Sequence, residues 1–70
     1  MDGIEFTTWI MINEFRTRAQ RSVEAAKAIW PRWEETGDEI LEARMDRADE
    51  RAVYWTVRAD HLEIALHSRQ

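Results

Sequence analysis

The stretch LEARMDRADERAVYWTVRADHLEIAL, residues 41–66, decides the fold of this chain. Its apolar residues recur in alternating steps of four and three, the a/d pattern of a helix that packs against another helix. These seam residues are Leu41, Met45, Ala48, Ala52, Trp55, Ala59, Leu62 and Leu66. The AVYWTV segment within it has the composition of a strand, but that weak preference yields to the unbroken periodicity. We therefore expect one helix over about residues 38–67.

The residues that interrupt helices are concentrated in WPRWEETGD, residues 30–38. Pro31 lacks a backbone donor and disfavours helix at the residue before it. Gly37 suits the position just after a helix, and Asp38 suits the N-cap of the next one. We expect a first helix over about residues 3–30, with Pro31 either kinking it or opening a short extra turn that ends at Thr36.

Two starting points are open for the first helix. Asp2 and Glu5 have the spacing of a capping box, and Met1 and Phe6 are placed for a hydrophobic staple. Thr7 or Thr8 is the alternative N-cap.

The first helix carries a stripe that matches the seam of the second, and the two predict an antiparallel hairpin. The stripe consists of Ile12, Phe15, Ala19, Ser22, Ala26, Ile29 and Trp33. Pairing Phe15 with Ala59 and Ala19 with Trp55 sets large groups against small ones, as dense packing requires. We expect a single all-α domain over residues 1–70.

Size and composition indicate that this hairpin does not act alone. A chain of 70 residues buries only about 60% of its unfolded surface, and without cysteines it has no disulfides. The predicted hairpin also leaves apolar residues outside the seam, clustered near its open end. They are Phe6, Trp9, Ile10, Met11, Val53, Tyr54, Val57 and Ile64, with Ile4 beside them. We expect these residues to contact a second copy, forming a four-helix bundle, or another protein.

A different dimer is also consistent with the charges. Within the second helix, Arg44, Arg51 and Arg58 occupy g positions, and Glu42, Asp49 and Glu63 occupy e positions. Two copies of this helix could therefore pair in parallel through ion pairs, with the first helix packed outside.

No pattern in the sequence indicates catalysis, a cofactor or a metal. Asp60, Glu63 and His67 share one helix side, but there is no Glu-x-x-His pair of the di-iron type. A glycine-rich phosphate loop is also absent. The longest apolar run, residues 9–12, is far too short to cross a membrane, and no secretory signal is present. We expect a cytoplasmic protein that is not an enzyme.

A locally basic part of the first helix gives an alternative function. Arg16, Arg18, Arg21 and Lys27 could contact the phosphates of RNA or DNA, although the net charge of −4 argues against nonspecific binding. They could equally offset the acidic start of the second helix. In layout the predicted dimer is similar to the ROP family of helical hairpins, and this similarity implies RNA binding.

The favoured interpretation is a small regulatory or inhibitory protein that binds another protein by helix packing, of a kind that phages and mobile elements encode. An RNA-binding hairpin dimer and a purely structural oligomerisation module are the alternatives.

Overall fold

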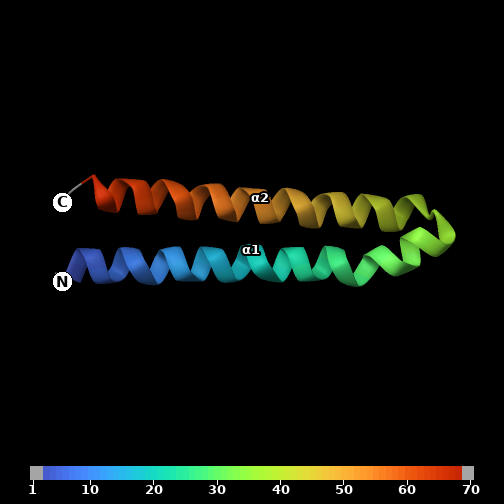
Figure 1. Cartoon of the computed structure of the whole chain (residues 1–70), viewed down its shortest axis with the longest axis horizontal. Coiled ribbons are helices and arrows are strands. Elements are labelled where there is room, and N and C mark those ends of the chain that lie inside the picture. The colour runs from blue at the N-terminus through green and yellow to red at the C-terminus, as the bar shows by residue number, and fades with distance from the viewer. Residues whose placement is uncertain (1–2, 69–70) are drawn as a thin grey trace.

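Two long antiparallel helices make up the described part of the chain, residues 3–68 of a computed structural model. Helix α1 spans Gly3–Thr36 and helix α2 spans Glu39–His67. They lie side by side along their whole length and form a rod of 52 × 15 × 12 Å, with both termini at one end (Figure 1). The helical hairpin predicted from the sequence is confirmed.

The hinge uses the two residues that the sequence assigns to it. Gly37 has a φ of 66° and its amide donates to the Trp33 carbonyl oxygen at 2.7 Å, which closes α1. Asp38 is the N-cap of α2, and its carboxylate accepts from the Ile40 amide at 2.8 Å. A two-residue connection of this kind is within the length range of the loops that join antiparallel helices.

Helix α1 does not end at about residue 30; of the two alternatives that the sequence leaves open at Pro31, the structure has the kinked, continuous helix. It continues through Pro31 to Thr36, and its last part bends toward α2 (green in Figure 1). Beyond Pro31, the half-buried Trp33 side chain lines a groove together with Met45 of α2. This apolar packing stabilises the helical conformation past the lost proline hydrogen bond.

The N-terminal capping alternatives are partly resolved. Thr7 and Thr8 lie inside α1, and their hydroxyls donate to the carbonyl oxygens of Gly3 and Ile4 at 2.8 Å, so neither residue is the N-cap. The capping box with Asp2 and the staple with Met1 lie outside the described residues.

The core is a single line of side chains along the seam between the helices. Its fully buried members all belong to the two predicted stripes: Ile12, Ala19, Met45, Ala48, Ala52, Ala59 and Leu66. Ile12 and Ala59 are 1% and 0% exposed, and Phe15 and Leu62 pack against them. Because α1 occupies the a/d seam of α2, the parallel coiled coil of two α2 copies is not the arrangement of this structure.

Candidate interaction surfaces

A stack of rings and guanidinium groups lies at the centre of the hairpin. The rings of Phe15 and Trp55 have centroids 5.0 Å apart, although the large-to-small pairing predicts that each meets an alanine. The Arg18 guanidinium lies 4.7 Å from the centre of the Trp55 ring, and the Arg58 guanidinium lies 5.7 Å from that of Phe15. Cation–π attraction therefore offsets the repulsion expected between these two arginines.

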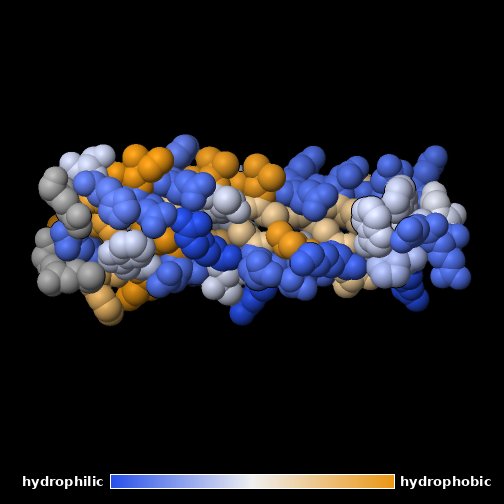
Figure 2. All heavy atoms as spheres, in the orientation of Figure 1, coloured by the Kyte–Doolittle hydropathy of each residue, from blue (hydrophilic) through white to orange (hydrophobic). Residues whose placement is uncertain are grey.

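The eight apolar residues predicted as one interface occupy different sides of the rod. Val53, Val57 and Ile64 lie within an arc of about 40° on α2, on the side turned away from α1. They are 62%, 44% and 62% exposed, and we call them the α2 edge. Figure 2 shows hydrophobic groups standing along this outer edge of α2, with hydrophilic groups on either side.

Two of the α1 residues form a second, separate edge. Phe6 and Ile10 are 60% and 50% exposed and lie on the side of α1 turned away from α2; we call them the α1 edge. A small hydrophobic group is visible there, at the end of the rod that holds the termini (Figure 2). One flat partner surface cannot cover both edges, because the width of the hairpin separates them.

The remaining three predicted interface residues lie elsewhere. Trp9, expected outside the core stripe, is half-buried and packs against the cluster of Ile12, Ala59 and Leu66, with its ring 6.4 Å from that of His67. Met11 flanks the seam and lines a shallow groove with Arg58. The Tyr54 ring lies 5.3 Å from the Arg58 guanidinium.

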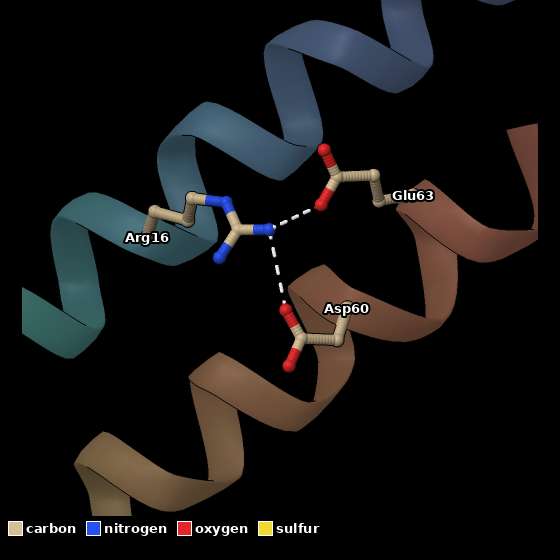
Figure 3. Close-up of polar contacts among 3 residues, drawn as sticks. All are labelled: Arg16, Asp60 and Glu63. Atoms are coloured by element: carbon tan, nitrogen blue, oxygen red, sulfur yellow. Dashed lines mark hydrogen bonds and ion pairs between the residues drawn. The ribbon is translucent and has the colours of Figure 1, made fainter. Parts of the chain in front are cut away.

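The basic residues of α1 do not form one surface. Arg16 reaches across to α2 and is bound by two carboxylates, Asp60 at 3.2 Å and Glu63 at 2.6 Å (Figure 3). Lys27 lies 3.7 Å from Glu24, and it lines the groove that also contains Asp46 and Asp49 of α2. Arg16 and Lys27 thus both have acidic neighbours, but the ion-pair partners of Arg16 lie in the C-terminal half of α2 and that of Lys27 lies on α1, not at the acidic start of α2.

Arg21 lies eleven residues from Ile10, so helical phase places it near the α1 edge. Arg18 lies on the face of the hairpin opposite Arg16 and joins four arginines of α2. Three of these, Arg44, Arg47 and Arg51, line a groove between the helices with Ala25 and Ile29 of α1. Arg58 lies on the same face, across Phe15. We call these residues the arginine face: Arg18, Arg44, Arg47, Arg51 and Arg58.

The two flanks of α2 carry opposite charges. Residues 40, 44, 47, 51, 54, 58, 61 and 65, on one flank, include no carboxylate. Residues 42, 46, 49, 53, 56, 60 and 63, on the other flank, include no lysine, arginine or histidine. We call the acidic side chains of this second flank the acidic face: Glu42, Asp46, Asp49, Asp60 and Glu63.

An apolar hollow lies on the acidic side of the rod, next to the hinge. It has a volume of about 460 Å³. Trp30 and Trp33, whose ring centroids are 5.7 Å apart, line it together with Met45, Lys27 and three acidic residues. The indole nitrogen of Trp30 donates to Glu34 at 2.8 Å, which ties this exposed ring to its own helix.

Residues 3–68 show neither a metal site nor a membrane-spanning helix. No group of three or more histidine, aspartate or glutamate side chains is gathered closely enough there to hold a metal ion. Neither helix of this part combines the length and apolar character that a membrane crossing requires.

Comparison with known proteins returned no relative: no family model matches the chain, and no curated protein or solved structure is significantly similar to it.

Proposed function

We propose that this chain is a non-catalytic regulatory protein that acts by helix packing, and that its first partner is a second copy of itself. The α2 edge carries the proposal. Its three aliphatic side chains, between 44% and 62% exposed, form a stripe that only another apolar surface would remove from water.

The charges on either side of the α2 edge support a dimer through this edge. Two hairpins packed by their arginine faces, or by their acidic faces, would bring like charges together. Contact through the α2 edge keeps the arginine faces apart and brings only the margin of each acidic flank, which includes Asp46 and Val53, to the contact. It places the two α2 helices against each other and the two α1 helices outside. The proposed assembly is thus a four-helix layer rather than a square bundle.

An antiparallel arrangement of the two α2 helices suits this assembly best. Asp46 and Glu50 are exposed and lie on the same side of α2 as the α2 edge, but nearer to the hinge. In a parallel dimer each would lie next to its symmetry mate, whereas an antiparallel dimer separates them. Three aliphatic residues make a small interface, so we expect a dissociation constant in about the micromolar range.

The α1 edge would stay accessible in this dimer, on the outside of the layer. Phe6 and Ile10 are therefore the residues that we propose to contact a target protein, which the chain would regulate or inhibit. The large exposed ring of Phe6 is typical of residues that anchor protein interfaces.

Sedimentation velocity on wild-type protein and on a Val57→Lys variant tests the dimer. The wild type should show reversible, concentration-dependent dimerisation, and the variant should remain monomeric because a lysine would be buried without a partner. Thr17→Lys is the matched control, since it places the same charge at an exposed, β-branched position on α1. A wild type that stays monomeric at high concentration, or equal dimerisation of both variants, would overturn the proposal.

A further inference from the structure

We propose that the arginine face binds the phosphate backbone of a nucleic acid. This surface differs from the basic α1 set identified in the sequence. It excludes Arg16 and Lys27, which acidic groups neutralise, and takes most of its charge from α2. It is separate from the two apolar edges, so it does not depend on the function proposed above.

Most charges of this face are free to meet a ligand. Arg18 has an ion pair with Glu14 at 2.8 Å. Within residues 3–68, no carboxylate oxygen lies within 4.0 Å of a side-chain nitrogen of the other four arginines: Arg44, Arg47, Arg51 and Arg58. A cluster of like charges without counterions raises the local potential, and binding a polyanion relieves it.

The shape of the face fits an extended chain of phosphates. Arg44 and Arg58 are fourteen residues apart in the sequence, or about 21 Å along the helix axis. This length matches about six nucleotides of one strand of a duplex, which rises about 3.4 Å along its axis per nucleotide. Arg44, Arg47 and Arg51 recur every three or four residues, and Arg58 follows seven residues later with Tyr54 on the turn between. A backbone lying along α2 would therefore meet a guanidinium on every helical turn but one.

The residue types also favour phosphate. All five cations are arginines, whose planar guanidinium group can donate two parallel hydrogen bonds to one phosphate. Tyr54 is 51% exposed on the same flank and offers an aromatic ring beside Arg58 on which an unpaired base could stack. The acidic face, on the opposite flank of α2, would repel the polyanion and so orient the approach.

Fluorescence anisotropy tests the proposal, with a labelled single-stranded RNA of about twenty nucleotides and a DNA duplex of about the same length. The wild type should bind at least one of these probes at about 50 mM salt and lose affinity steeply toward about 200 mM. The double variant Arg47→Gln/Arg51→Gln should bind about tenfold or more weakly. The slope of the logarithm of affinity against the logarithm of salt concentration should become shallower by about 1.4 for RNA or about 1.8 for duplex DNA. This change corresponds to the loss of two phosphate contacts.

Arg16→Gln/Lys27→Gln is the matched control, because it removes the same two charges from the opposite side of the hairpin. It should bind within about twofold of the wild type and keep the same salt dependence. Far-UV circular dichroism verifies that both double variants remain helical. Absence of binding by the wild type to both probes at low salt would overturn the proposal, and so would an equal loss of affinity in the two double variants.

The same titrations distinguish single-stranded RNA from duplex DNA as the molecule that supplies the phosphates. Binding of the RNA alone, with a further severalfold loss in Tyr54→Leu, would identify a single strand whose bases stack on Tyr54. Binding of both probes without an effect of Tyr54→Leu would identify contact with the backbone alone.

Discussion

The Phe15 ring of α1 and the Trp55 ring of α2 lie 5.0 Å apart with their planes tilted by 36°, and an arginine covers each of them. The stack joins the two helices near the middle of the rod. Since the seam around it is built largely from alanine, these two rings supply much of the apolar contact between α1 and α2. We infer that the stack holds the register of the hairpin.

Removing one of these rings should unfold a large fraction of the protein. Trp55→Ala should lower the free energy of unfolding by about 3 kcal/mol, a large part of the stability that a domain of this size can have. Urea denaturation followed by far-UV circular dichroism measures the change. Trp30→Ala is the control, because Trp30 is 53% exposed and should cost about 1 kcal/mol or less. Equal losses in the two variants would contradict the role of the stack.

Ala59 lies in the seam between the two helices and is 0% exposed. Ala59→Leu should destabilise the hairpin by about 1–3 kcal/mol, because the added methyl groups must push Phe15 or Ile12 aside. Ala65→Leu adds the same atoms at an exposed position of α2 and should change stability by about 0.5 kcal/mol or less. Thermal melts of the two variants and the wild type provide the comparison. If Ala59→Leu melts at the wild-type temperature, the seam is less tightly packed than the structure indicates.

The hinge depends on the left-handed conformation of Gly37. Gly37→Ala should cost about 1 kcal/mol, because a β-carbon is disfavoured at a φ of 66° even though no neighbouring atom would touch it. Gly3→Ala is the opposite case: Gly3 begins α1, an added β-carbon meets nothing within 4 Å, and alanine favours helix. Chemical denaturation should therefore show a loss for Gly37→Ala and no loss for Gly3→Ala. Loss in both variants would point to a cause other than backbone conformation.

The ion pairs of Arg16 should contribute only modestly to stability. Its side chain is 42% exposed, and exposed pairs contribute about 0.2–1 kcal/mol each. Arg16→Gln should therefore lower the free energy of unfolding by about 1 kcal/mol at low salt, and the difference should shrink in about 1 M salt as the charges are screened. Denaturation at both salt concentrations measures it. A loss that persists at high salt would show that packing of the arginine stem, rather than charge, is responsible.

Much of the hairpin follows from local sequence. The four-three periodicity of residues 41–66 identifies the side of α2 that is buried, and Gly37 and Asp38 identify the hinge by their backbone preferences. Predictions based only on neighbouring residues are less accurate at Pro31, where α1 continues because Trp33 packs beyond it. They also do less well at Trp9, which the tertiary fold draws against the core although it lies outside the stripe.

The sequence by itself determined that the chain forms two antiparallel helices, because periodicity and capping depend only on neighbours along the chain. The tertiary structure alone decided which charges share a surface. The position of Arg18 in α1 fixes the side of α1 on which it lies, and the same holds for Arg47 in α2. These two sides form one face only because of the register and orientation in which the helices pack. The same packing sends Arg16 to Asp60 and Glu63 on the opposite face, a contact between helices that the pattern of either helix alone does not specify.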